Sequence, residues 1–360
     1  MENTEYDIKS MTPSEVSELI VSLGDKKFRA KQIYQWMHQK LVASYDEMTN
    51  VPAALRQKLA AEYPLTVLEP VRVQISQIDG TRKYLFRLSD GNLIESVLMK
   101  YHHGNSVCIS SQVGCRMGCR FCASTIDGLV RGLLPSEMLE QIYRIQKDIG
   151  ERVDNVVVMG SGEPFDNFDN LLRFIELLNN EEGLNISARN LTVSTCGIVP
   201  KIYELADMQP QITLAISLHS PNDELRRSIM PVANKYSIDE IMKACRYYVE
   251  KTGRRITFEY SLVKDVNDTD ECAMQLVHLV KGIKCHVNLI PVNPIKERDY
   301  KQTAQAGVSH FRSRLEKCGV NATVRREMGR DIDGACGQLR RSYMESTDSY
   351  ADAPDGIKQE

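Results

Sequence analysis

The sequence of 360 residues predicts an α/β protein in which a mostly parallel sheet curls into a partial (βα)6 TIM-like barrel. Two observations lead to this fold class. First, apolar runs of strand length alternate with amphipathic runs of helix length through most of the chain after residue 100, which is typical of βαβ units. Second, polar or glycine-rich turns follow successive strand candidates, as in barrels whose chemistry lies at the carboxyl ends of the strands.

Residues 1–66 are predicted to form a small helical accessory domain. Thr12–Glu15 combines an N-cap, a proline at the first helical position and a glutamate that completes a capping box, and Gly24 ends this first helix. Further helices are predicted at Phe28–Leu41 and from near Pro52 to Tyr63. Lysines and arginines give the domain a basic side, which fits either a solvated face of a packing domain or an arm that docks RNA.

Residues 67–100 are predicted to form a β-meander that links this domain to the rest of the chain. Asp79-Gly80 and Asp90-Gly91 separate three runs of strand character, and Asp-Gly between such runs is a strong hairpin signal. The three strand candidates are Val71–Ile75, Tyr84–Leu88 and Leu93–Leu98.

Residues 101–343 are predicted to form the barrel domain, and the polar, acidic residues 344–360 a disordered tail. The strand candidates are Ser106–Gln112, Asn155–Met159, Leu191–Thr195, Ile212–Leu218, Ile256–Val263, His286–Ile290 and Ala322–Arg326. The helix candidates are Ser136–Ile149, Asp169–Asn180, Pro200–Met208, Ile238–Lys251, Thr269–Ile283 and Gln302–Lys317.

The composition is that of an ordinary globular protein of the cytoplasm. Hydrophobic residues make up 42% and charged residues 26%, and no apolar run approaches the length of a membrane span, so neither a membrane helix nor a signal peptide is expected. Ten cysteines, three of them clustered, favour a metal site in a reducing compartment over a disulfide framework. A net charge of −3 leaves RNA recognition to local basic patches.

Three cysteines, Cys115, Cys119 and Cys122, follow the first barrel strand at C-x3-C-x2-C spacing. Thiolates this close together select zinc or an iron–sulfur cluster. A structural zinc site usually closes with four protein ligands, and no partnered ligand pair is evident nearby. Three ligands therefore favour a 4Fe–4S cluster with one open iron, and the alternative is a zinc knuckle that borrows a distant ligand.

Four further polar turns close predicted barrel strands, and together they indicate a site around the cysteine loop. They are Gly160–Pro164, Ser194–Gly197, Ser217–Asp223 and Asn288–Pro294. Two more cysteines stand out. Cys336 lies in a glycine-flanked segment without helical or strand period, which fits a functional loop as well as a buried small side chain, and Cys108 lies on the first strand. The remaining cysteines are expected to be core residues: Cys196, Cys245, Cys272, Cys285 and Cys318.

These motifs together resemble the radical S-adenosylmethionine (SAM) superfamily, and within it the RNA adenine methyltransferases of the RlmN/Cfr family. The likeness runs from about residue 7 to residue 343. Pro164 and Pro291 resemble the group that methylates carbon-2 rather than the Cfr-type group that methylates carbon-8, and Ser161 departs from the family pattern. The resembling motifs are Cys108–Gln112, Phe121–Ser124, Gly162–Pro164, Ser217–His219, Asn288–Pro291 and Asp331–Leu339.

The resemblance implies a role for each matched position. The three cysteines of the loop would hold the cluster, whose open iron chelates SAM. Cys336 would carry a methyl group from a first SAM molecule, and a second SAM molecule would supply the radical that leads to a covalent protein–RNA adduct. Glu95 would remove the ring proton, and Cys108 would release the product by forming a disulfide with Cys336, which requires Cα atoms about 4.4–6.8 Å apart. The SAM-binding positions would be Gly162, Glu163, Ser194, Ser217, Leu218, His219 and Asn293.

The resemblance also implies the substrates and partners. The substrates would be an adenosine in the peptidyl-transferase centre of 23S rRNA and the adenosine 3′ to the anticodon of some tRNAs. An electron donor such as flavodoxin or its reductase would reduce the cluster, and the enzyme would be a cytoplasmic monomer. Phosphate contacts would come from the N-terminal domain and from arginines near Cys336. The rivals are carbon-8 methylation, with antibiotic resistance as its consequence, and a zinc-stabilised RNA-binding protein without catalysis.

Overall fold

The computed structural model describes residues 7–292, 300–332, 338–340 and 342–343, and it confirms the partial barrel. One ten-stranded sheet runs through the molecule in the order β1-β2-β3-β4-β7-β8-β9-β10-β11-β12. From β4 onward, each strand is parallel to its neighbour in the sheet. These strands are β4 (Gly104–Ile109), β7 (Asn155–Val158), β8 (Leu191–Thr195), β9 (Thr213–Ser217), β10 (Ile256–Leu262), β11 (Cys285–Pro291) and β12 (Ala322–Val324).

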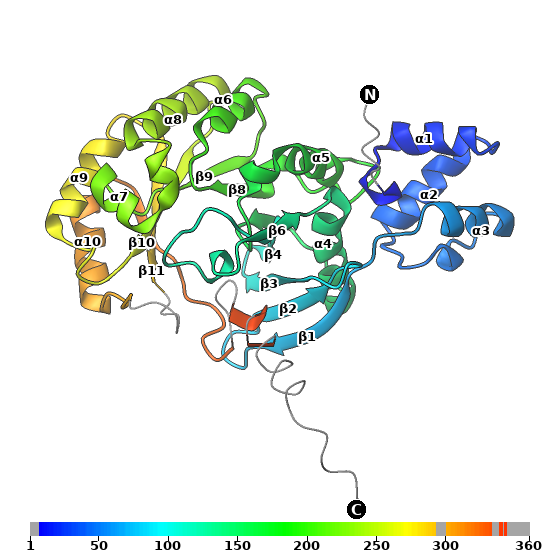
Figure 1. Cartoon of the computed structure of the whole chain (residues 1–360), viewed down its shortest axis with the longest axis horizontal. Helices are drawn as coiled ribbons and strands as arrows, with labels where there is room; N and C mark the ends of the chain where they lie inside the picture. Colours follow the sequence, from blue (N-terminus) through cyan, green and yellow to red (C-terminus); the bar gives the residue numbers. More distant parts are fainter. Residues whose placement is uncertain (1–6, 293–299, 333–337, 341, 344–360) are drawn as a thin grey trace, which may run out of the picture.

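A helix connects each pair of consecutive parallel strands, as expected for βαβ units. The helices line the outer side of the curved sheet (Figure 1), and their apolar faces share one hydrophobic core with the strands. All strand ends that carry the predicted polar turns therefore meet at one edge of the barrel. The connecting helices are α4 (Pro135–Ile149), α5 (Phe168–Asn179), α6 (Val199–Asp207), α8 (Ile238–Thr252), α9 (Asp270–Val280) and α10 (Gln305–Lys317).

The predicted meander is present as β1 (Glu69–Ile75), β2 (Arg82–Arg87) and β3 (Leu93–Tyr101). Its strands pair antiparallel, and β3 also pairs with the first barrel strand, with Val97 opposite Cys108. The meander is thus continuous with the barrel sheet and brings β2 and β3 to the side of the first barrel strand.

The N-terminal helices are α1 (Pro13–Ser22), α2 (Phe28–His38) and α3 (Ala53–Glu62), and they enclose a hydrophobic cluster of their own. The Thr12–Glu15 capping box is formed as predicted. The second helix ends three residues before the predicted Leu41. That leucine adopts a left-handed backbone conformation, with φ of +56°, which a helix cannot continue.

Buried polar contacts fix the helical domain to α4 of the barrel (Figure 1). The Lys9 ammonium lies 2.6 Å from the Glu140 carboxylate, and neither side chain is exposed to solvent. His38 Nδ1 lies 2.6 Å from the Tyr143 hydroxyl, and burial lowers the pKa of His38 to about 3, so the ring is neutral near pH 7. Because moving the domain away from α4 would break this buried ion pair and this buried hydrogen bond, the contacts favour one orientation of the domain.

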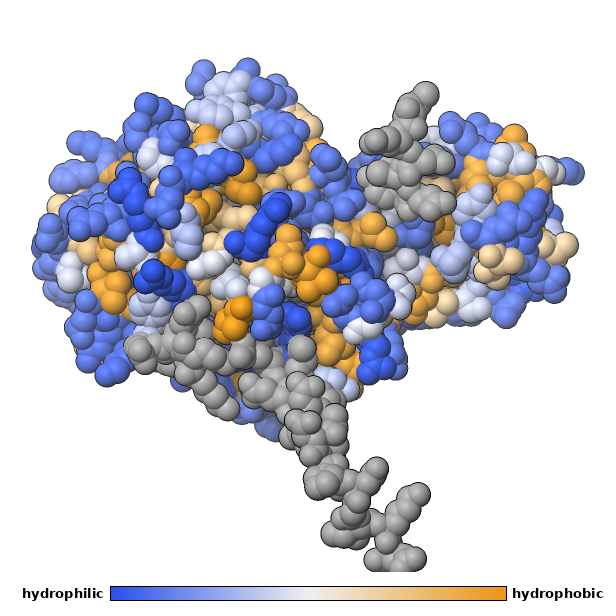
Figure 2. All heavy atoms as spheres, viewed as in Figure 1, coloured by the Kyte–Doolittle hydropathy of each residue, from blue (hydrophilic) through white to orange (hydrophobic). Residues whose placement is uncertain are grey.

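Several short elements were absent from the sequence-based prediction. They are α7 (Asp223–Ile229), the small sheet of β5 (Gln112–Gly114) and β6 (Leu129–Gly132), and the 3-10 turns Ile8–Ser10, Tyr45–Glu47, Ala123–Thr125, Pro164–Asn167, Ala188–Asn190 and Pro231–Asn234. Among the described residues, no helix combines the length and apolarity that a membrane span requires. The predicted disordered tail, 344–360, lies outside the described residues. Figure 2 shows a largely hydrophilic face with hydrophobic residues gathered near its middle.

Candidate active site at the carboxyl ends of the barrel strands

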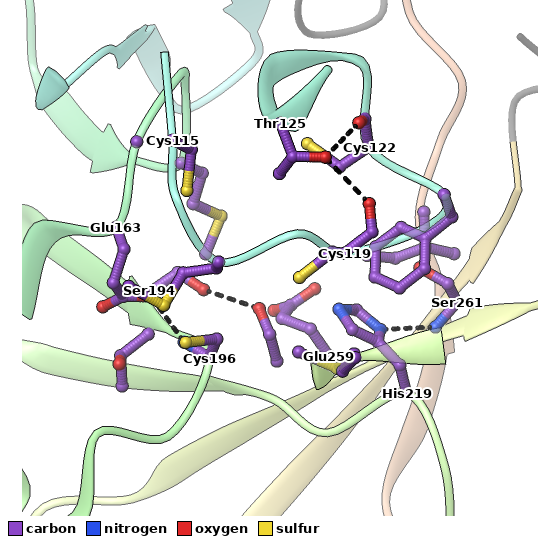
Figure 3. A pocket seen from close by; sticks show the side chains of 18 of the residues that line it. Cys115, Cys119, Cys122, Thr125, Glu163, Ser194, Cys196, His219, Glu259 and Ser261 are labelled. Atoms are coloured by element: carbon purple, nitrogen blue, oxygen red, sulfur yellow. Dashed lines mark hydrogen bonds between the residues drawn. The ribbon is translucent and has the colours of Figure 1, made fainter. Parts of the chain in front are cut away.

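A pocket of about 270 Å³ opens at the carboxyl ends of the parallel strands, under the cysteine loop (Figure 3). Its wall combines that loop with residues that end β7, β8, β9, β10 and β11. Of the predicted site residues, the pocket brings together Cys115, Cys119, Cys122, Gly162, Glu163, Ser194, Ser217 and His219.

Backbone contacts hold the cysteine loop over the pocket. Gly114 has a φ of +74°, and a Cβ there would lie 2.0 Å from the carbonyl oxygen of Gly128, so only glycine fits. The Cys115 N–H donates to that same carbonyl at 2.8 Å. On the other side of the loop, the Thr125 hydroxyl donates to the carbonyls of Cys119 and Cys122 (Figure 3). The three thiols are therefore presented from a fixed backbone to one cavity.

The chemistry of the three thiols fits a positively charged centre larger than a single ion. Burial raises the pKa of Cys115 to about 12 and raises that of Cys119 further, so bound cationic iron would be needed to keep these sulfurs as thiolates. Among the residues described, no three His, Cys, Asp or Glu side chains are grouped as ligands of one metal ion. Three cysteines around a cavity suit a 4Fe–4S cluster better than the alternative zinc knuckle.

The Gly162-Glu163 turn after β7 packs tightly against Ser111 and Gln112, which follow the first barrel strand, β4. Gly162 has a φ of +111°, and a Cβ there would come within 2.7 Å of the Ser111 and Gln112 side chains. The buried Glu163 carboxylate accepts hydrogen bonds from the N–H groups of Phe165 and Cys196, at 3.0 and 2.7 Å. Burial raises the pKa of Glu163, whereas these hydrogen bonds favour the charged form. Glu163 therefore presents a carboxyl group of fixed orientation in the pocket wall.

His219 and two serines line the next strand ends. The Oγ atoms of Ser194 and Ser217 lie 3.2 Å apart, and His219 Nδ1 accepts a hydrogen bond from the Ser261 N–H at 3.0 Å (Figure 3). The His219 ring packs edge-on against Phe121 of the cysteine loop. Burial lowers the pKa of His219 to about 3, so this imidazole is a neutral hydrogen-bonding group in the pocket near pH 7.

Two predicted SAM positions do not contribute a described side chain to the pocket. The Leu218 side chain is buried in the barrel core, although the adjacent backbone is at the strand end and its N–H donates to the carbonyl of Glu259. Asn293 lies outside the described residues.

The structure adds residues that the sequence analysis missed. Cys196, predicted to be a core residue, is buried but also lines the pocket beside Cys119. Glu259 and Arg325 also line the pocket, and Glu259 accepts a hydrogen bond from the Asn288 amide at 2.8 Å. In the sequence, Glu259 looks like an ordinary charged residue of a strand, and Arg325 like one that follows a strand. Only the alternation of side chains along β10 could have indicated that Glu259 points inward.

A buried guanidinium lies behind the cysteine pocket. Arg226 of α7 is fully buried, and it donates to the carbonyl oxygens of Cys196, Leu218 and Ser217. One of its nitrogens, Nη1, has no hydrogen-bond partner among the described residues. A buried positive charge held mainly by carbonyl dipoles favours negative charge nearby, which a cluster with three thiolate ligands would supply.

Cys108 and Glu95 lie beside the pocket rather than in its lining. Val97 pairs with Cys108 across β3 and β4, and Glu95 lies two residues before Val97, so Glu95 and Cys108 share one face of the sheet. The buried Glu95 carboxylate lies 3.0 Å from the Lys83 ammonium and accepts a hydrogen bond from the Arg340 N–H at 2.6 Å. Cys336 lies outside the described residues.

Comparison with known proteins agrees with this geometry. The family model of the radical SAM superfamily matches residues 109–277, and that of the ribosomal RNA large subunit methyltransferase N-terminal domain matches residues 6–64. A probable dual-specificity RNA methyltransferase RlmN from Lachnospira eligens is 72% identical over 342 residues, which cover 95% of this chain and 98% of that protein. The protein of the same description from Lachnoclostridium phytofermentans is 60% identical, covering 95% and 96% of the two chains.

A solved structure is similar over almost the whole chain. The crystal structure of a radical SAM methyltransferase from Sphaerobacter thermophilus has a TM-score of 0.89 and 44% sequence identity, and the match covers 92% of this chain and 98% of that one.

Proposed function

Because the chain belongs to the RlmN family of radical SAM RNA methyltransferases, we propose that it methylates carbon-2 of one adenosine in the peptidyl-transferase centre of 23S rRNA and of the adenosine 3′ to the anticodon in some tRNAs. The observation that carries this proposal is the close identity to relatives described as dual-specificity RNA methyltransferases. Pro164 after Gly-Glu and Pro291 after Asn-Leu-Ile favour carbon-2 over carbon-8.

The family implies a 4Fe–4S cluster and SAM, and we assign the cluster to Cys115, Cys119 and Cys122, whose thiols line the pocket. When bound and reduced, the cluster supplies the electron that converts SAM into a carbon-radical source, which an unreactive ring carbon requires. The neighbouring pocket residues would then bind SAM. Gly162 allows close backbone approach, Glu163 offers a carboxylate to the ammonium group, and Ser194, Ser217 and His219 offer neutral hydrogen-bonding groups.

We assign Cys336 as the methyl carrier and Cys108 as the cysteine that releases the product. Contacts of the described residues support their proximity. Arg340 follows Cys336 by four residues and its N–H binds Glu95, which shares a sheet face with Cys108. Four residues span at most about 14 Å, so the chain length permits Cys336 to meet Cys108. In the releasing step, the Cys108 thiolate would attack the Cys336 sulfur and form a disulfide. The sulfur–carbon bond would break with its electron pair passing to the carbon on the adenine, which takes up a proton to become the methyl group. Two SAM molecules would be consumed per methylation.

Glu95 is proposed as the base that removes the ring proton. The ammonium of Lys83 lies 3.0 Å from this carboxylate and would hold it in place as the proton acceptor. Both Glu95 oxygens are engaged, one by Lys83 and one by the Arg340 N–H, so proton acceptance requires one of these contacts to lengthen when RNA is bound.

RNA recognition is assigned to the basic side of the N-terminal domain and to arginines near the pocket mouth. Arg325 lines the pocket, and Lys40 lies over the Trp36 ring at 3.4 Å on the N-terminal domain. The target adenine would leave its stack to reach the pocket, as in other base-modifying enzymes. We also propose that a flavodoxin-type protein donates the electron that reduces the cluster, and that the enzyme is a monomer.

We predict that Cys119→Ala abolishes both iron binding and RNA methylation. The buried thiol is one of three ligands from the protein, so its loss leaves the cluster with only two. Protein purified without oxygen should be brown, and iron analysis should give about four iron atoms per chain for the wild type and less than about one for the variant. Cys318 was expected in the core but is exposed in the structure, where it follows the end of α10. Cys318→Ala is therefore the matched control and should retain iron. Colourless wild-type protein with stoichiometric zinc would support the non-catalytic rival.

A further inference from the structure

The turn between β1 and β2 (residues Ser76–Thr81, hereafter the β1–β2 turn) binds a distant part of the chain. Asp331, far from the turn in sequence, accepts hydrogen bonds from the Ser76 hydroxyl at 2.6 Å and from the Gln77 N–H at 2.7 Å. Ser76 is buried, and its oxygen also accepts the N–H groups of Ile78 and Asp79. The Asp331 carboxylate thus completes the hydrogen bonding of the turn.

A second contact strengthens this attachment. The Gly329 N–H donates to the Asp79 carboxylate at 3.0 Å. Partial burial opposes ionisation of Asp79, but hydrogen bonds from Gly329 and Thr81 outweigh it and lower the pKa of Asp79 to about 2. Gly329 has a φ of +65°, a conformation that favours glycine, and a Cβ there would lie 3.0 Å from Ile332 and 3.3 Å from Thr81, so glycine suits this close approach.

The same meander holds the chain again just after residue 337. The Arg340 N–H donates to Glu95 Oε1 on β3, and the Leu339 side chain is fully buried. Lys83 on β2 fixes the other Glu95 oxygen. Figure 1 shows the segment that follows β12, in orange, passing beside the β1–β2 end of the sheet, and the short red helix beyond it lying over the meander.

Between these two attachments lies Cys336, five residues after Asp331 and four before Arg340. We propose that the β1–β2 turn positions the methyl-carrying Cys336. The turn does so by binding Asp331 and Gly329 through Ser76, Gln77 and Asp79. This inference rests on the proposed role of Cys336. It gives the meander a function in the reaction beyond extending the sheet.

Cys336 needs to be positioned because its thiol has to react at two places. Cys336 must meet SAM in the pocket and later Cys108 beside β3, and a chain tethered at both ends has far fewer conformations than a free one. Proper placement of reacting groups contributes strongly to rate, and a displacement of about 1 Å can cost a hundredfold. Releasing the Asp331 end should therefore slow the chemical steps without weakening RNA binding.

The test compares Asp331→Ala with the wild type as reconstituted holoenzymes. We expect kcat for RNA methylation to fall by about 10- to 100-fold, with KM for RNA changed by less than about twofold. Iron content should not change. Asp331→Asn keeps one acceptor oxygen and should recover part of the rate. In hydrogen exchange, the Gln77–Asp79 amides should exchange at least about tenfold faster in Asp331→Ala.

Glu327→Ala is the matched control, because this carboxylate lies in the same segment and its ion pair is with the nearby Arg330. Glu327→Ala should leave kcat unchanged.

Two results for Asp331→Ala would overturn the proposal. One is faster hydrogen exchange at the β1–β2 turn with an unchanged kcat, and the other is an unchanged rate of hydrogen exchange at the turn. If Asp331→Ala does not fold, Ser76→Ala decides by the same two readouts, with an expected kcat loss of about 3- to 10-fold. If mass spectrometry finds no methyl group on wild-type Cys336, the proposed function is wrong. Hydrogen exchange would still show whether Asp331 holds the β1–β2 turn, so the two failures can be told apart.

Discussion

Cys336→Ala should abolish RNA methylation, with a residual rate at least about a thousandfold below that of the wild type, because no other group can take over the carbon that a covalent carrier transfers. Iron content and SAM binding should persist, since the pocket and its three cysteines are built from other parts of the chain. The measurement is product formation on 23S rRNA fragments, with iron analysis and SAM binding on the same preparations.

The exposed Cys318 provides the control for the loss of a thiol that has no assigned role. Cys318→Ala should methylate RNA at the wild-type rate. Normal turnover by Cys336→Ala would refute the methyl-carrier assignment, although it would not affect the cluster assignment.

Cys108→Ala should stop the reaction one step later and trap the enzyme on its substrate. Under the proposed mechanism, Cys336 would still be methylated and would still form the bond to adenine, but no thiolate would remain to attack the Cys336 sulfur. We expect a protein–RNA species that survives denaturing electrophoresis, at up to about one RNA per chain, and a turnover rate at least about a hundredfold lower. Cys108 is buried, and it shares a sheet face with Glu95, whose carboxylate accepts the hydrogen bond from the Arg340 N–H.

Cys245→Ala is the matched control for this variant, because Cys245 is also a buried cysteine but lies on α8 in the hydrophobic core. It should form no covalent species and should lose only the stability expected of a small cavity, about 1 kcal/mol. If Cys108→Ala turned over normally, the releasing role would belong to another group.

The barrel could be predicted from sequence because each strand and helix carries its own periodic pattern. The sequence does not predict α7, although Asn222 caps it and Asp223 and Glu224 occupy its first turn, because the helix has only seven residues and directly follows the polar turn after β9. The cysteine loop could also be predicted, since its spacing alone restricts the chemistry.

The rest of the site depends on contacts between residues far apart in sequence, which local patterns do not encode. Arg226 looks like a surface arginine of a short helix, yet it is fully buried behind Cys196. Glu259 looks like any strand glutamate, and Asp331 like any loop aspartate, until the fold brings them to Asn288 and Ser76. The pairing of Glu95 with Lys83 follows from the register of β2 on β3, where Lys83 lies opposite Val97, two residues beyond Glu95.

The identity of the methylated base tests the central claim most directly. Ribosomal RNA and tRNA would be isolated from cells lacking the gene and from the same cells carrying it again, digested to nucleosides and analysed by mass spectrometry against synthetic standards. We predict that 2-methyladenosine is missing from both RNAs without the gene and returns with it, and that Cys336→Ala does not restore it. The appearance of 8-methyladenosine instead, or of no methylated adenosine that depends on the gene, would contradict the assignment.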